Sequence, residues 1–313
     1  MNKRQLLESI LNTTIMVLDG AMGTMLHQMG LFEPTTAQAG GCEQLSLTHP
    51  NAIANIHRKY LAAGADIITT NTFCANAATM KSSKWVIKLN HSAATIARHE
   101  ADRFSMASKP RFVAGSMGPT MPMLSHLAEF KRAQAAMQLM EDYKQQAIAL
   151  IEGGVDLLLL ETATDVNNVQ IALDAIEHAQ QQSQSSVPVM VSATIGHKGT
   201  LPSGHSLATL LETIAPYKPL SVGLNCSLGA EHIAMHVVKL ARFAPCYVSA
   251  HPNSGMPNTQ GQYPQTPELM TNSLAVPMNQ GMLNIVGGCC GTTPEHIARI
   301  AQQAILCKPR RIG

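Results

Sequence analysis

Eight short apolar runs recur along the whole chain, and this repetition limits the possible folds more than any other feature. They lie at residues 15–20, 65–73, 111–118, 155–162, 187–195, 220–226, 246–252 and 283–291. Each run is nearly continuous in apolar residues and does not alternate with polar ones. This pattern is typical of strands that are buried on both faces of a parallel sheet.

Helical patterns lie between these runs, at residues 51–64, 133–154, 165–182, 229–244 and 293–306. The second is followed by a stop at Gly153 and Gly154, and the third begins after Asp165, a plausible N-cap. Strands that alternate with helices predict an α/β fold, a (β/α)8 TIM barrel, with a doubly wound open sheet as the alternative. No linker or low-complexity tract divides the sequence, so we expect one domain over residues 1–313.

Composition excludes several classes of function. The formal net charge is +2, the basic residues are scattered and aromatic residues make up 4% of the chain, so we expect no nucleic-acid partner. No apolar run reaches the roughly 18 residues of a membrane span, so we expect no membrane partner. The first residues lack the pattern of a secretory signal peptide, which predicts a cytoplasmic location.

Polar and reactive residues gather at the predicted carboxyl ends of the strands, where barrel enzymes carry their active sites. These residues are Asp19, Asn71, Gly118, Glu161, Thr194, Asn225, Cys226, His251, Cys289 and Cys290.

Three of the seven cysteines could hold one metal ion. Cys226 ends the sixth run and Cys289 and Cys290 end the eighth, 63 and 64 positions later. Strands six and eight of a barrel lie roughly 10 Å apart, which a loop and two side chains can bridge. Zinc binds thiolates tetrahedrally, and its catalytic sites use three protein ligands. Adjacent cysteines reach one ion only if the backbone bends, and the nearby glycines at 287, 288 and 291 would permit this.

Other interpretations of these cysteines remain open at this stage. Cys226 could be a buried apolar residue, and Cys289 and Cys290 could form a vicinal disulfide or include an inert thiol. We expect the remaining cysteines to be structural or incidental: Cys42, Cys74, Cys246 and Cys307. His251 could also be a ligand, but we favour a loop histidine that is satisfied by hydrogen bonds.

Six motifs carry a resemblance to a known family. They are VLDGAMGTML (17–26), GADIITTNTF (64–73), LLLLETATD (157–165), GLNCSLG (223–229), AHPNSGMPN (250–258) and IVGGCCGTTPEHI (285–297). The chain resembles the homocysteine S-methyltransferase family, and within it the N-terminal homocysteine-binding module of cobalamin-dependent methionine synthase. The resemblance implies a (β/α)8 barrel that binds Zn²⁺ through Cys226, Cys289 and Cys290 and methylates the thiolate of L-homocysteine to give L-methionine.

The resemblance also implies substrate contacts. The backbone amides of the turn at Asp19, Gly20 and Ala21 would hold the amino-acid carboxylate, and Glu161 would pair with the ammonium group. Asn225 would support Cys226 by hydrogen bonding. Thr70, Asn71 and Thr194 are weaker candidates at the same rim.

The sequence departs from the methionine synthase pattern at several points. Thr69 stands where an acidic residue is common, which predicts a less negative pocket, and the segments 32–42 and 121–133 look shorter. Residues 1–313 themselves contain no folate barrel and no DxHxxG-type cobalamin segment. The resemblance favours methylcobalamin on a separate corrinoid protein or domain as methyl donor. The alternatives are a sulfonium donor, a betaine-type donor, or a non-catalytic module that presents homocysteine to a partner.

Overall fold

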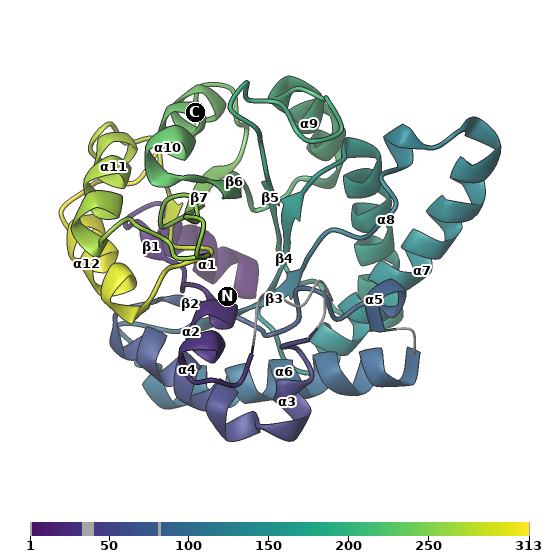
Figure 1. The fold of residues 1–313 in the computed structure, drawn as a ribbon, viewed down its shortest axis with the longest axis horizontal. Coiled ribbons are helices and arrows are strands. Elements are labelled where there is room, and N and C mark those ends of the chain that lie inside the picture. The colour runs from purple at the N-terminus through teal and green to yellow at the C-terminus, as the bar shows by residue number, and fades with distance from the viewer. Residues whose placement is uncertain (1, 33–40, 81–82, 313) are drawn as a thin grey trace.

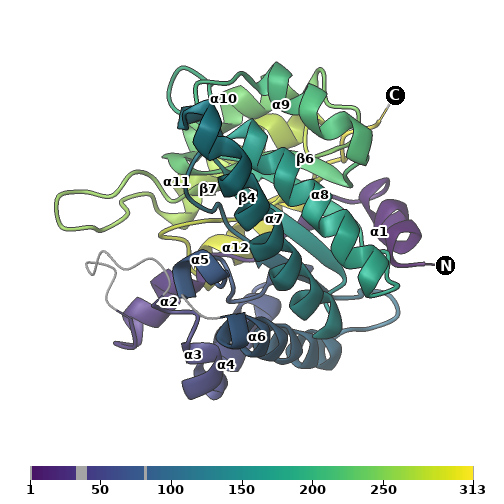
Figure 2. The same ribbon diagram turned by 90° about the vertical axis from the view of Figure 1, so that its right-hand side faces the viewer.

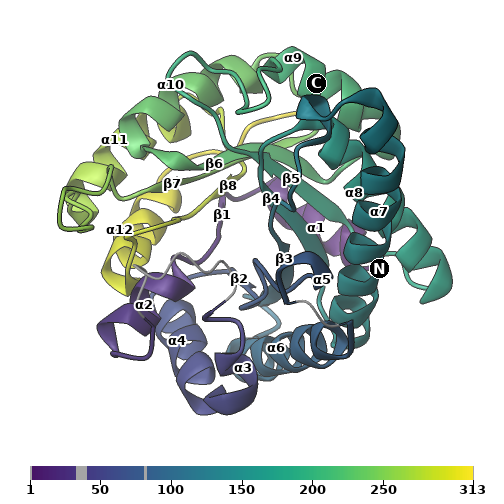
Figure 3. The same ribbon diagram turned by 45° about the vertical axis from the view of Figure 1, so that its right-hand side comes forward.

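The fold is an eight-stranded parallel barrel, seen in a computed structural model that describes residues 2–32, 41–80 and 83–312. The strands lie inside a ring of helices (Figure 1; Figure 3). They are β1 Met16–Val17, β2 Ile67–Thr69, β3 Phe112–Met117, β4 Leu157–Ala163, β5 Val189–Ala193, β6 Ser221–Gly229, β7 Tyr247–Asn253 and β8 Ile285–Val286. The prediction of a (β/α)8 barrel is confirmed, and the open sheet is excluded.

Strand pairing closes the barrel. The order is β1-β8-β7-β6-β5-β4-β3-β2, and all pairs are parallel. A parallel bridge between Leu18 and Ile67 joins the two ends of this series. Each of the eight predicted runs overlaps one strand. β1 and β8 are only two residues long.

The described helices surround the barrel, most of them on its outside (Figure 1; Figure 3). They are α1 Lys3–Leu11, α2 Met22–Gln28, α3 Leu45–Thr48, α4 Pro50–Ala62, α5 Ala77–Met80, α6 Ser83–Phe104, α7 Glu129–Glu152, α8 Val166–Gln182, α9 Leu207–Ile214, α10 Ala230–Ala241, α11 Pro267–Asn279 and α12 Pro294–Ala304, with 3-10 turns at Leu124–His126 and Ala215–Tyr217. None of them is long and apolar enough to cross a lipid bilayer.

The five predicted helices correspond to α4, α7, α8, α10 and α12. The Asp165 cap is present, since its carboxylate accepts the backbone N–H of Asn167. The start of α7 was predicted four residues too late, because residues 129–132 continue the helix. Segment 121–133, one of the two that look shorter than in the methionine synthase pattern, therefore contains a 3-10 turn and the first turn of α7. Most of the second such segment, 32–42, lies outside the described residues.

The core has two layers that follow the alternation of the strand side chains. Met16, Leu18 and Ile67 point into the barrel, where they pack with residues of the other strands. Their neighbours Val17 and Ile68 point outward and pack against the helices. Strands buried on both faces account for the continuous apolar runs.

Helix α1, which the sequence analysis did not assign, closes the amino-terminal end of the barrel. Its Leu7 and Leu11 are fully buried and belong to the interior cluster of strand side chains. The Tyr247 hydroxyl, at the start of β7, donates to Asn12 just after the helix at 2.9 Å. Figure 2 shows α1 on the side opposite the long loop between β7 and α11.

We expect Leu11→Ala to lower the free energy of unfolding by about 2–5 kcal/mol, because it leaves a cavity in a well-packed interior. Urea denaturation followed by circular dichroism measures this. Ser9→Ala on the exposed face of the same helix is the matched control and should change stability by about 0.5 kcal/mol or less. Equal effects of the two substitutions would show that α1 is not part of the core.

Candidate metal centre and active site

Three cysteine sulfurs meet at the carboxyl end of the barrel. The Sγ atom of Cys290 lies 3.9 Å from that of Cys226 and 4.0 Å from that of Cys289. All three sulfurs lie within 4.8 Å of one another. A tetrahedral zinc ion with Zn–S bonds of about 2.3 Å needs sulfurs about 3.8 Å apart. The spacing and the chemistry of this donor set therefore fit zinc.

The backbone is irregular at the ends of β4 and β6, and β6 carries Cys226. Cys226, Ser227 and Thr162 have φ values of 58°, 48° and 57°, a region that residues with a Cβ rarely adopt. The register shifts at the same places, between Leu160 and Ala163 in β4 and between Asn225 and Gly229 in β6. Bulges of this kind redirect side chains, and strained residues gather at functional sites.

Backbone hydrogen bonds fix the turn that carries Cys289 and Cys290. The N–H of Cys289 donates to the Pro252 carbonyl at 2.8 Å, and the N–H of Gly288 donates to the Asp19 carbonyl at 3.1 Å. Gly291 has a φ of 80°, so it provides the predicted bend. Gly288 serves another purpose than flexibility, since a Cβ there would lie 2.5 Å from the hydroxyl of Thr292.

Asn225 connects the two irregular strand ends. Its side-chain oxygen accepts the Thr162 N–H at 2.9 Å and the Ser192 hydroxyl at 2.7 Å. Its amide group donates to the Thr162 hydroxyl at 2.7 Å. Asn225 is fully buried and precedes Cys226 directly. One side chain thus holds both the backbone next to Glu161 and the backbone of a cysteine.

Asp19 and Glu161 face the same cavity. Both carboxylate oxygens of Asp19 accept hydrogen bonds from Thr69, from its N–H at 2.8 Å and from its hydroxyl at 3.0 Å. Thr69 is thus a direct partner of Asp19. Burial raises the pKa of Asp19 well above its usual value, although these hydrogen bonds oppose the shift.

Glu161 accepts a hydrogen bond from the Ser116 hydroxyl. Burial raises the pKa of Glu161 to about 7, against the effect of this bond and with a smaller contribution from Cys226. Its carboxylate therefore titrates close to neutral pH.

Two of the three backbone amides in the turn after β1 already donate hydrogen bonds within the protein. The N–H of Asp19 donates to the Ile67 carbonyl and that of Ala21 to the Thr292 hydroxyl. Of the three predicted amides, only that of Gly20 has no partner among the described residues. The backbone amides of the first turn of α2 lie beside Gly20. The N-cap residue of this helix is Ala21, whose side chain cannot accept a hydrogen bond from them.

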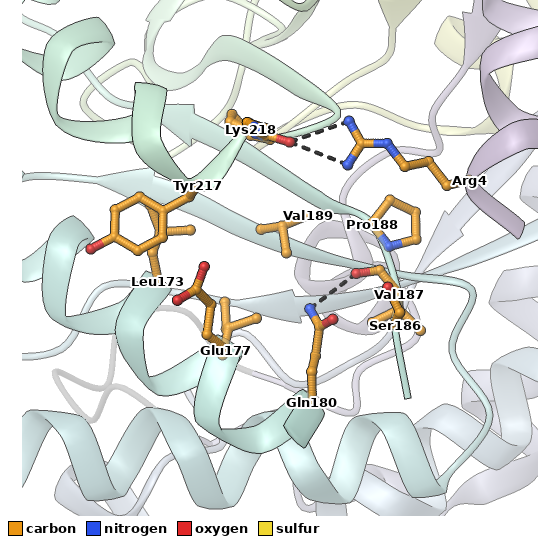
Figure 4. A pocket seen from close by; sticks show the side chains of 12 residues that line it. Arg4, Leu173, Glu177, Gln180, Ser186, Val187, Pro188, Val189, Tyr217 and Lys218 are labelled. Atoms are coloured by element: carbon orange, nitrogen blue, oxygen red, sulfur yellow. Dashed lines mark hydrogen bonds between the residues drawn. The ribbon is translucent and has the colours of Figure 1, made fainter. Parts of the chain in front are cut away.

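These groups line a cavity of about 290 Å³ at the carboxyl ends of the strands. Its lining includes the three cysteines and the carboxylates of Asp19 and Glu161, and the described part of the lining contains no lysine or arginine. Another cavity, at the opposite end of the barrel, has a different character. Figure 4 shows two of its polar side chains bonded to the backbone: Arg4 donates to the Lys218 carbonyl and Gln180 donates to that of Val187.

A family model described as homocysteine S-methyltransferase matches residues 16–304. The chain belongs to the homocysteine S-methyltransferase family. The resemblance seen in its sequence motifs is confirmed at this level.

Solved structures with the same fold include the homocysteine methyltransferase MmuM from Escherichia coli. Its metallated form aligns with a TM-score of 0.77 and 21% identity, over 96% of this chain and 100% of that one. The oxidized form gives 0.76 and 21%, over 97% and 100%. At this identity the likeness shows a shared fold.

The three cysteines of this family member differ in how readily each thiol loses its proton. Hydrogen bonds from the thiols of Cys226 and Cys289 lower the pKa of Cys290 to about 3. Hydrogen bonding to Cys226 and Cys290 raises the pKa of Cys289 well above its usual value. The cluster by itself favours one thiolate beside two thiols. A divalent cation would let all three ionise, so its binding should release protons.

The structure changes the interpretation of His251. It lies within β7 and not in a loop, and it is 2% exposed. Its Nε2 atom has no hydrogen-bond partner among the described residues, so the predicted hydrogen-bond satisfaction is wrong for this nitrogen. Burial lowers the pKa of His251 to about 4, which keeps the imidazole neutral at pH 7. The ring lines the cavity with the cysteines.

The weaker candidates divide into two groups. Thr70 and Asn71 line the cavity and also hold its wall, since the Thr70 hydroxyl accepts the N–H of Ser116 at 2.9 Å. Thr194 is buried but is not part of the described lining.

Sequence reasoning missed Ser116, Thr292 and Glu43. Ser116 lies at the end of a predicted strand, a position that could have indicated its role. In the sequence, Glu43 comes after two glycines and before the short helix α3. No periodic pattern at this position points to the site.

Proposed function

We propose that this chain transfers a methyl group to the thiolate of L-homocysteine, giving L-methionine, and that Zn²⁺ held by Cys226, Cys289 and Cys290 takes part. The observation that carries the proposal is the convergence of three sulfurs within 4.8 Å at a cavity that also contains Asp19 and Glu161. We further propose a single domain over residues 1–313 and a cytoplasmic location.

Each group has a separate task in this proposal. When bound, zinc would ionise the substrate thiol and keep its sulfur nucleophilic. Glu161 pairs with the substrate ammonium group. The amides of Gly20 and of the first turn of α2 receive the carboxylate. Asp19, fixed by Thr69, holds this turn beside β2. These contacts orient the sulfur for in-line attack on the donor methyl group.

Two classes of methyl donor remain in the proposal. The sequence resemblance favours methylcobalamin on a separate corrinoid protein. The lining with its carboxylates and, in its described part, without basic side chains favours a small sulfonium ion.

A donor assay tests the proposal. Zinc-loaded protein and L-homocysteine are incubated with S-methylmethionine, S-adenosylmethionine or a methylated corrinoid protein, and methionine is measured. We expect methionine with at least one donor. Stoichiometric homocysteine binding without turnover on any donor would instead identify a homocysteine-presenting module.

We expect homocysteine binding to weaken as the pH falls below about 7, by up to tenfold per unit, because the Glu161 carboxylate becomes protonated. Isothermal titration of zinc-loaded protein between pH 5.5 and 8.5 measures this. Glu161→Gln retains the three cysteines, so it should bind weakly and lose the part of the pH dependence that comes from residue 161. If both proteins gave the same profile, Glu161 would not be the ammonium partner. Folding shows the opposite sign: the raised pKa means that this group costs stability as the pH rises through about 7.

A further inference from the structure

Glu43 is a third carboxylate in the cavity, and one of its oxygens has no hydrogen-bond partner in the described part of the chain. The residue is 2% exposed and lines the cavity. Oε1 accepts the N–H of Cys74 at 3.0 Å, whereas Oε2 is buried and has no hydrogen-bond partner among the described residues. Buried carboxylates are normally paired, because an unpaired one is costly. The free oxygen therefore indicates a position for a ligand group.

The chain around Glu43 is held in place. The side chain of Asn71 donates to the carbonyl of Cys42 at 2.9 Å and to the hydroxyl of Ser46 at 3.2 Å. These bonds tie the residues on both sides of Glu43 to the loop after β2. Glu43 is thus a fixed part of the wall of the cavity.

Glu43 and Glu161 serve different parts of the cavity. Glu161 interacts electrostatically with Cys226, so it lies close to the sulfurs. Glu43 interacts instead with the Cys42 thiol, electrostatically and through a hydrogen bond, and both residues line the cavity. If homocysteine places its sulfur at the cysteine cluster and its ammonium group at Glu161, its only positive charge is already paired. Glu43 is then free for the other reactant.

Resting on the proposed function, we propose that Glu43 holds the positive charge of a small cationic methyl donor and selects it over neutral donors. In the reaction, the donor's C–S bond breaks and its electron pair stays on the donor sulfur. A pair from the homocysteine thiolate forms the new S–C bond. The sulfonium charge disappears in this step, so the attraction to Glu43 weakens for the spent donor and favours its release.

The test compares a cationic donor with a neutral one in the zinc-loaded full chain. For Glu43→Gln, which keeps an acceptor for the Cys74 N–H, we expect the KM for S-methylmethionine to rise about 10- to 100-fold. Homocysteine affinity by calorimetry and the rate of homocysteine methylation by methyl iodide should stay within about twofold. Glu43→Asp keeps the charge at a shorter reach and should give a smaller rise. Glu152→Gln, on the exposed end of α7, is the control.

Two outcomes would overturn the role of Glu43: an unchanged KM for S-methylmethionine, or an equal loss of homocysteine affinity in Glu43→Gln. Turnover of the parent protein with a corrinoid protein alone would do the same. Failure of the proposed function looks different. The parent protein would then fail to methylate homocysteine with any of the donors, including methyl iodide. Calorimetric binding of S-methylmethionine to parent and variant still decides the role of Glu43 in that case, and equal or absent binding rejects it.

Discussion

Cys289→Ala is expected to remove zinc from the protein and to lower methyl transfer to below about 1% of the parent rate. With one of three thiolates gone, the site keeps only two protein ligands, fewer than zinc sites in proteins use. The substrate thiol would then stay largely protonated at neutral pH. Zinc per chain, measured by elemental analysis after dialysis, should fall from one to near zero. Cys290→Ala and Cys226→Ala should behave alike, because all three sulfurs share one site.

Cys307→Ala is the matched control, since this thiol follows α12, where it donates to Asn279 and accepts from Gln303. It should retain zinc and activity. Full zinc occupancy in Cys289→Ala at the parent's affinity would contradict the assignment of the metal site.

Asn225→Ala is expected to destabilise the protein by about 2–4 kcal/mol and to weaken zinc binding at the same time. The substitution leaves the N–H of Thr162 and the hydroxyl of Ser192 without their acceptor in a buried place. It also frees the strained backbone at Thr162 and Cys226 to relax away from the arrangement that directs the cysteine. Chemical denaturation of the metal-free protein gives the first effect, and competition with a chromophoric chelator gives the second.

Asn272→Ala, on the exposed face of α11, provides the comparison and should change neither quantity. A destabilised Asn225→Ala protein with parental zinc affinity would separate the two roles and limit Asn225 to folding.

The barrel could be predicted because its strands are buried on both faces. Runs such as Leu157–Leu160 have no polar side, and a parallel sheet under helices is the usual place for them. Helices α6, α9 and α11 were harder to recognise. Helix α11 contains Pro277, and α9 is only eight residues long, so neither offers a long uninterrupted pattern.

The site was predictable where residues lie within or just after the carboxyl-terminal part of a strand, as Cys226, Glu161 and Asp19 do. Glu43 and His251 needed the structure. Their importance comes from unpaired atoms in a buried place, and a sequence does not show which partners a side chain lacks. Thr69 needed the structure for a related reason: the sequence predicted only a less negative pocket at this position, and the structure adds that Thr69 is the partner that fixes Asp19.

Helix α1 and the packed interior close one end of the barrel, so in the part of the chain that the structure describes the sulfurs are reached from the opposite end. In the proposed function homocysteine takes the deepest position, and a donor above it would block its way out. Turnover should therefore follow a compulsory order, with the acceptor bound first and the spent donor leaving before methionine. A high concentration of donor would then occupy the empty enzyme and slow the reaction, a kinetic signature that originates in nine residues on the far side of the molecule.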